Sequence, residues 1–212
     1  MIQLILKRKK KSFWDIVSTK AKFKSDINTK TAIQKSLKYF TNEDNVLDFA
    51  CGNGIVSFLI ADKVKQIIAI DTSDKMIKYA KESALELNIN NVDFYKIEIS
   101  ENILNNYKFD VILAFNILQY INDLDSLFKR INQLLSENGI FISSTACLGN
   151  RKSFLSRLVS FVSKLGVIPN FNFLKNTELE SKIKECGFEL VESVQILDSD
   201  EYLIVMKKST NI

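Results

Sequence analysis

Runs of apolar residues alternate along this chain with segments of helical periodicity, and this alternation restricts the fold more than any other feature. The apolar runs occupy residues 45–50, 66–70, 91–96, 109–115 and 139–145. Between the last two runs, one helical face is formed by Leu124, Leu127, Phe128, Ile131, Leu134 and Leu135. Strands that are apolar throughout are covered on both faces. The pattern therefore predicts an α/β fold, a parallel sheet with helices on both faces.

The last two apolar runs, residues 189–196 and 201–207, are connected differently. The short polar link Asp198-Ser199-Asp200 lies between these two runs. So short a connection requires that the two strands form an antiparallel hairpin. Before it, Thr177 and Glu180 have the spacing of a capping box, which predicts the start of a helix. No internal repeat or low-complexity linker divides the 212 residues, so we expect a single domain.

The composition excludes several classes of protein. The chain contains no histidine, which rules out a Ser-His-Asp triad, a histidine-ligated zinc site and a histidine general base. Its three cysteines are widely spaced, which indicates reduced thiols and no metal site. No apolar stretch approaches the roughly 20 residues that span a bilayer, and no signal peptide is evident. We therefore expect a cytoplasmic protein.

The charge pattern bears on the partners of the chain. The formal net charge of +4 is too mild to indicate a nucleic-acid-binding protein. A basic run at residues 7–11 fits either a solvated tail or a contact with phosphates or an anionic membrane.

The stretch VLDFACGNGIVSF, residues 46–58, carries the clearest functional signal. Glycine-rich turns between a strand and a helix usually hold an anion on backbone N–H groups. Asp48 at the entrance would repel a phosphate, and Ser57 stands where a dinucleotide-binding turn has its third glycine. The turn therefore favours a ligand with a cationic group, although a turn without any ligand is the alternative.

Residues 46–54 resemble the first motif of the class I S-adenosylmethionine-dependent methyltransferases, with Ala50 in place of the first glycine. Residues 109–120 and 185–191 resemble later elements of the small-molecule members, such as the ubiquinone and menaquinone methyltransferases. The resemblance implies a Rossmann-like, seven-stranded, mostly parallel sheet in the order 3-2-1-4-5-7-6. The last hairpin would be antiparallel, with helices on both faces.

The resemblance also implies a cofactor, S-adenosyl-L-methionine, and the residues that bind it. Asp48 would attract the α-ammonium group, Asp71 would accept both ribose hydroxyls, and Met76 and Glu98 would contact the adenine. Asp71 as a plain helix cap and Met76 as a core residue are the alternatives. The implied cofactor-binding residues are Asp48, Ala50, Cys51, Gly52, Asn53, Gly54, Asp71, Thr72, Met76, Ile97, Glu98, Ile99 and Asn116.

The catalytic residues are less well defined. Methyl transfer is an in-line displacement that depends mainly on positioning, with a base required only if the acceptor must lose a proton. Asn116, Gln119 and Tyr120 follow the fourth predicted strand and are the catalytic candidates. The hydroxyl groups of Tyr39 and Tyr120 could line an acceptor site, although aromatic core positions are the alternative.

The single domain divides into four segments by these patterns. Residues 1–42 would form an N-terminal cap in which Phe13 and Trp14 close the cofactor side, and residues 45–147 the cofactor-binding core. Residues 148–175 would form a lid-like insert, and residues 176–208 a C-terminal helix and hairpin. The insert has an apolar helical face beside basic residues, which fits a lid over an apolar acceptor with peripheral membrane contact, or a helix packed on the sheet edge.

These observations predict a methyltransferase that acts on a small, partly apolar acceptor and releases S-adenosyl-L-homocysteine. The alternatives are an RNA or protein methyltransferase and a catalytically silent binding subunit of the same fold. An NAD-dependent oxidoreductase is disfavoured by Asp48 and Ser57.

Overall fold

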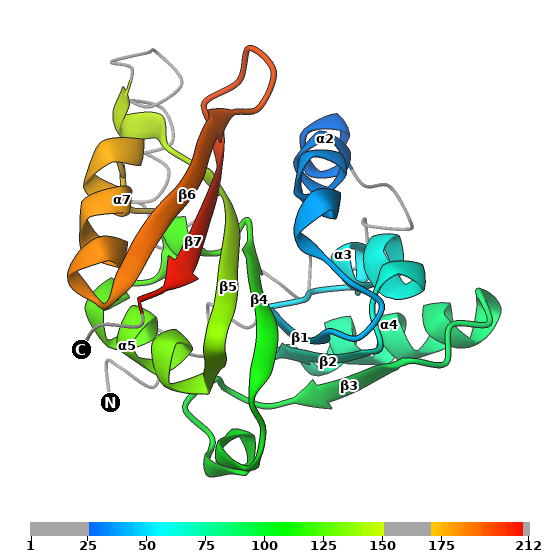
Figure 1. Ribbon diagram of the computed structural model, residues 1–212. Helices are drawn as coiled ribbons and strands as arrows, with labels where there is room; N and C mark the ends of the chain where they lie inside the picture. Colours follow the sequence, from blue (N-terminus) through cyan, green and yellow to red (C-terminus); the bar gives the residue numbers. More distant parts are fainter. Residues whose placement is uncertain (1–25, 151–170, 210–212) are drawn as a thin grey trace, which may run out of the picture.

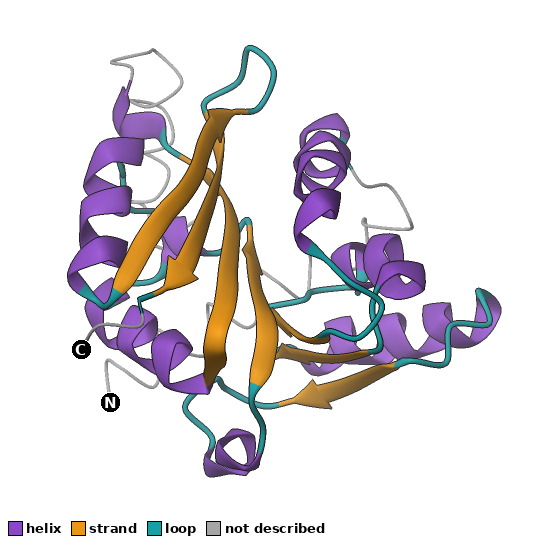
Figure 2. Ribbon diagram, in the orientation of Figure 1, coloured by secondary structure: helices purple, strands orange, loops and turns teal. Residues whose placement is uncertain are grey.

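A computed structural model describes residues 26–150 and 171–209, and these form one sheet flanked by helices (Figures 1 and 2). The strands are β1 (Asn45–Phe49), β2 (Gln66–Asp71), β3 (Val92–Lys96), β4 (Phe109–Phe115), β5 (Leu135–Ala146), β6 (Phe188–Gln195) and β7 (Glu201–Lys208). Their order is β3-β2-β1-β4-β5-β7-β6. β7 runs antiparallel to β5 and β6, whereas the other neighbouring pairs are parallel. The predicted fold class, strand order and terminal hairpin are confirmed.

Helices cover both faces of the sheet. They are α2 (Ile27–Ser36), α3 (Ile55–Ile60), α4 (Asp74–Glu86), α5 (Leu124–Leu134) and α7 (Asn176–Glu185), with short 3-10 turns η1 (Leu37–Tyr39), η2 (Ala61–Lys63), η3 (Asn102–Asn106), η4 (Leu118–Tyr120) and η5 (Leu148–Asn150). α2, α3 and α4 lie on one face, and α5 and α7 lie on the other (Figure 1). Because side chains alternate along a strand, Val46 of β1 packs on the face covered by α2, α3 and α4, and Leu47 packs on the face covered by α5 and α7.

Most strand ends lie within one residue of the prediction, and two element starts differ from it by more or for another reason. β5 begins at Leu135, several residues before the predicted start, because Leu135 pairs with Phe109 across an irregularity in the β4–β5 register. α7 begins at Asn176 after Lys175, so the capping box predicted at Thr177 was wrong. The Lys175 N–H donates to Glu178 Oε2 at 3.4 Å, and the two side chains form an ion pair at 3.0 Å.

The order in which the strands are added to the sheet reverses between β1 and β4, which run parallel to one another. The chain builds outward from β1 through β2 to β3, and then returns to β4 on the other side of β1. In open α/β sheets the carboxyl ends of two such strands diverge and leave a crevice for a ligand. The turn after β1 and the segment after β4 both lie at this edge.

Candidate functional site

The turn after β1 is built from left-handed backbone conformations. Ala50, Gly52 and Gly54 have φ angles of 58°, 56° and 83°. The φ of 83° at Gly54 favours glycine, and a Cβ atom there would also lie 2.8 Å from the Phe58 ring. Around Gly52, no atom lies within 4 Å of the corresponding Cβ position, which leaves the backbone open to a ligand.

Asp71, at the end of β2, ties this turn to the next strand. Its Oδ2 accepts a hydrogen bond from the Gly52 N–H at 3.0 Å, and its Oδ1 accepts one from the Ser73 N–H at 2.8 Å. Burial raises the pKa of the Asp71 carboxyl, and the backbone donors around it oppose that effect. A carboxylate has about four acceptor sites, so Asp71 retains acceptor capacity for hydroxyl groups.

Asp48 lies beneath the turn and is only 1% exposed. The hydroxyl of Ser57, from α3, donates to Asp48 Oδ2 at 2.6 Å. Burial raises the pKa of Asp48 from 3.8 to about 6, while hydrogen bonds from Ser57 lower it and the charge of Asp71 raises it further. The acid that the sequence placed at the entrance of the turn is therefore a buried, hydrogen-bonded carboxyl.

A cavity of about 320 Å³ opens at the carboxyl ends of β1 and β4. It is lined by Phe49, Ala50, Cys51, Gly52, Ile70, Asp71, Thr72, Met76, Ile97, Phe115, Asn116, Ile117 and Ile121. The lining is mainly apolar with a few polar groups, as is usual for sites that bind organic ligands.

The cavity brings together most of the predicted cofactor-binding residues. Those that line it are Ala50, Cys51, Gly52, Asp71, Thr72, Met76, Ile97 and Asn116. Five others are absent from its wall, namely Asp48, Asn53, Gly54, Glu98 and Ile99. Glu98 is exposed and Ile99 half-buried just after β3, so a contact between Glu98 and an adenine stays a prediction.

Sequence reasoning missed several apolar members of the wall. Phe49 and Ile70 are the apolar neighbours of predicted positions, and Phe115 ends β4. The sequence does show that these residues lie near the ends of strands. That position alone does not distinguish a residue of the cavity wall from a residue of the hydrophobic core.

Asn116 connects the cavity to the first helix. Its φ angle of 54° turns the chain sharply after β4, and its N–H donates to the Ser144 carbonyl at 2.8 Å. Its side-chain amide donates to Thr29 Oγ1 of α2 at 3.4 Å. A strained non-glycine residue that is held from both sides is typical of functional sites.

The other two catalytic candidates lie beside Asn116 on η4. Gln119 is 4% exposed, and its side-chain oxygen has no hydrogen-bond partner among the described residues. The Tyr120 ring packs edge-on against Phe171, with centroids 5.5 Å apart, and burial raises its pKa. Neither residue lines the cavity.

Tyr39 lies elsewhere. Its hydroxyl donates to Glu192 Oε2 of β6 at 2.7 Å, and Lys38 pairs with the same carboxylate at 3.0 Å. The Tyr39 hydroxyl therefore makes a structural hydrogen bond between η1 and β6.

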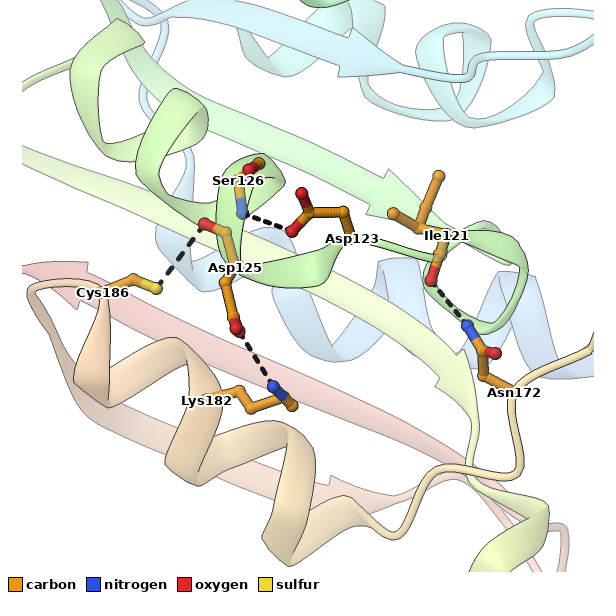
Figure 3. A network of polar contacts seen from close by, with 7 residues as sticks. All are labelled: Ile121, Asp123, Asp125, Ser126, Asn172, Lys182 and Cys186. Atoms are coloured by element: carbon orange, nitrogen blue, oxygen red, sulfur yellow. Dashed lines mark hydrogen bonds and ion pairs between the residues drawn. The ribbon is translucent and has the colours of Figure 1, made fainter.

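The segment that follows residue 170 holds η4 in place. The Asn172 N–H donates to the Gln119 carbonyl at 2.7 Å, and its side-chain amide donates to the Ile121 carbonyl at 2.6 Å. Figure 3 shows Asn172 directed at Ile121, and Lys182 of α7 directed at Asp125 of α5. The Lys182 Nζ donates to Asp125 Oδ1 at 2.9 Å. The contacts of Asn172 support the wall formed by Ile121.

The carboxyl of Glu201, at the start of β7, is also buried. Glu201 is 8% exposed and accepts a hydrogen bond from Ser144 Oγ at 2.5 Å. Burial raises its pKa, and the nearby charge of Asp26 raises it further. The starts of α2 and β7 and the end of β5 thus meet in one polar network.

Some predicted features lie outside the described residues. These are the basic run at residues 7–11, Phe13, Trp14 and most of the lid-like insert. Within residues 26–150 and 171–209, no helix is long and apolar enough to cross a membrane. In the same ranges, no group of three or more acidic or cysteine side chains could hold a metal ion.

The strand order with an antiparallel final hairpin, and a mainly apolar cavity between an acidic turn and the end of β4, define the class I methyltransferase architecture. A family described as "Methyltransferase domain" matches residues 40–199, and the chain belongs to this family. The predicted resemblance is confirmed.

Curated relatives include two ubiquinone biosynthesis O-methyltransferases. The one from Pelagibacter ubique is 36% identical over 100 residues, which are 47% of this chain and 41% of that protein. The one from Nitrosomonas europaea is 30% identical over 158 residues, which are 72% of this chain and 66% of that protein. The matched region therefore spans less than two thirds of either relative's own length.

The fold also matches solved structures. The PH0226 protein from Pyrococcus horikoshii OT3 has a TM-score of 0.72 and 24% identity, covering 85% of this chain and 89% of that one. At this identity the likeness concerns the fold alone.

Proposed function

We propose that this chain transfers the methyl group of S-adenosyl-L-methionine to an oxygen atom of a small, partly apolar acceptor. The observation that carries the proposal is the cavity at the β1–β4 switch point, where Asp71 and the open Gly52 backbone face a mainly apolar wall. Membership of the methyltransferase domain family supports the reaction, and the names of the curated O-methyltransferases support oxygen as the acceptor atom.

The lining residues fit this cofactor by their chemistry. Asp71 retains acceptor capacity for ribose hydroxyls, and Met76 and Ile97 supply apolar contacts for an adenine ring. The buried Asp48 carboxyl suits an ammonium group and would repel a pyrophosphate, which disfavours NAD.

When bound, S-adenosylmethionine supplies a methyl group activated by its sulfonium and is released as S-adenosylhomocysteine. The chain's own residues bind, orient and exclude water. Asn116 marks the boundary between the donor and acceptor ends, because it lines the cavity and also contacts α2. Ile117, Ile121 and Phe115 provide an apolar surface on the acceptor side.

Calorimetric titration with S-adenosylhomocysteine, with NAD as the control ligand, tests the cofactor. We expect micromolar binding of the first and none of the second. Asp71→Asn should weaken binding at least tenfold, the scale of a hydrogen bond to a charged group, whereas Asp62→Asn on the surface should not. Absence of binding to either ligand would favour the silent binding subunit.

A radiolabelled methyl donor and a panel of phenols with alkyl chains of increasing length test the acceptor. We expect methylation of a phenolic oxygen, with KM falling as the chain lengthens. Methylation of RNA or protein, or RNA binding that weakens steeply with salt, would instead favour the macromolecular alternative.

We also propose a cytoplasmic location. Cys51, Cys147 and Cys186 are all free thiols, which fits a reducing compartment.

A further inference from the structure

Ser57 and Asp48 form a buried pair behind the turn. Ser57 is fully buried, Asp48 is 1% exposed, and the hydroxyl donates to the carboxyl at 2.6 Å. The residues come from different elements, since Asp48 belongs to β1 and Ser57 to the first turn of α3. The hydrogen bond between them therefore joins the strand before the glycine turn to the helix after it.

Within residues 26–150 and 171–209, no cation pairs with Asp48. α3 carries no titratable side chain, and Lys30 and Lys35 of α2 are exposed. The charged group that acts on Asp48 is Asp71 of β2, a second acid.

Among the described residues, the thiol of Cys51 is a further titratable group at the turn, and burial keeps it protonated by raising its pKa. Two acids without a counter-ion in a buried site repel one another and favour either a proton or a cation. The turn between them is the predicted place of the donor's amino-acid end.

We propose that Ser57 is a positioning residue that fixes the Asp48 carboxylate beneath the turn that would receive the donor's ammonium group, so that donor binding releases a proton from this buried site. The inference rests on the proposed function and adds to it a linkage between pH and donor affinity. The Asp48 O–H bond breaks, the proton leaves to solvent, and the ammonium group supplies the missing positive charge.

The energetics follow from competition between the proton and the ammonium group. Since burial places the pKa of Asp48 at about 6, the free protein is partly protonated in mildly acidic solution. Below this pH the affinity should fall by up to tenfold for each pH unit, because one proton must be displaced. A plot of donor affinity against pH should therefore change slope, or break, near this pKa. The Ser57 hydroxyl lowers the pKa of Asp48, so loss of this hydroxyl should move the break to higher pH.

Calorimetric titration from pH 5 to pH 8 tests the proposal with two ligands. S-adenosylhomocysteine carries the ammonium group, and 5′-methylthioadenosine shares its nucleoside but lacks the amino-acid part. We expect the first to bind about tenfold more weakly at pH 5 than at pH 7. The second should weaken less, because it shares only the ribose contact with Asp71, whose pKa is also raised by burial.

Three variants refine the test. Ser57→Ala should weaken S-adenosylhomocysteine binding about tenfold at pH 7, move the break upward and leave methylthioadenosine unaffected. Asp48→Asn should abolish the break altogether. Ser83→Ala removes another buried serine, on α4 and away from the cavity wall, and should match the natural protein.

The outcomes separate the two proposals. Failure of both ligands to bind would refute the proposed function itself. Binding of both ligands with the same pH profile, or an equal loss of both in Ser57→Ala, would leave the methyl donor in place and overturn the role of Ser57.

Discussion

The buried Asp48 carboxyl makes a prediction about stability that needs no ligand. Its pKa is raised from 3.8 to about 6, so the folded protein binds this proton more tightly than the unfolded chain. A raised carboxyl pKa costs stability when the group ionises. The loss begins above the unfolded pKa, near pH 4, and is complete above about pH 6.

The magnitude follows from the two pKa values. A difference of about two corresponds to roughly 3 kcal/mol, at about 1.4 kcal/mol for each tenfold change in proton binding. Asp48→Asn removes the ionisation, so its free energy of unfolding relative to the natural protein should rise by roughly 3 kcal/mol between pH 4 and pH 7.5. An unpartnered asparagine amide would add a cost of about 1–3 kcal/mol at every pH, which shifts the curve but not its slope.

Urea denaturation of both proteins at intervals from pH 4 to pH 8 measures this difference directly. The exposed control, Asp62→Asn, should change stability by less than about 0.5 kcal/mol. A difference between Asp48→Asn and the natural protein that stays constant with pH would refute the reasoning, because the carboxyl would then ionise as easily in the folded state as in the unfolded chain.

Three further substitutions address the turn, the wall and the surface. Ala50→Gly should stabilise the fold by roughly 0.5 kcal/mol, since relief of a φ of 58° exceeds the added chain entropy, and a loss above 1 kcal/mol in denaturation would contradict this. Asn172→Ala removes the bond to the Ile121 carbonyl and should cost about 1 kcal/mol, with several-fold faster amide hydrogen exchange in residues 118–122; unchanged exchange would argue against the clamp. Tyr39→Phe should cost about 1 kcal/mol of stability without changing acceptor KM, and a raised KM would restore the acceptor-site interpretation.

The sequence predicted the sheet well because each strand has its own local signal. Apolar runs with short polar links placed β4 at its observed bounds and the β6–β7 hairpin within one residue. The helical face of α5 is buried from Leu124 to Leu134. Predictions failed where local signals competed, as at the start of α7, where an earlier lysine and glutamate capped the helix instead.

The site was predicted less completely, because its contacts join residues that are distant in sequence. Motif positions identified Asp71 and Asn116, yet nothing in the sequence shows that Ser57 donates to Asp48 across a turn. The bonds from Asn172 to Gln119 and Ile121 likewise connect segments about 50 residues apart. Long-range hydrogen bonds depend on side-chain directions that only the folded sheet establishes.

Two residues with strained backbone angles shape the proposed donor cavity. Ala50 after β1 and Asn116 after β4 both adopt left-handed backbone angles that cost non-glycine residues about 1–2 kcal/mol each, and both line the cavity. The neighbouring strands hold each bend, through Cys51 N–H to the Ile70 carbonyl at 3.0 Å and Asn116 N–H to the Ser144 carbonyl at 2.8 Å. Each bend directly follows one of the two strands that flank the switch point, so the sheet fixes the backbone on both sides of the cavity. The opening is therefore maintained by the sheet itself, before any ligand enters it.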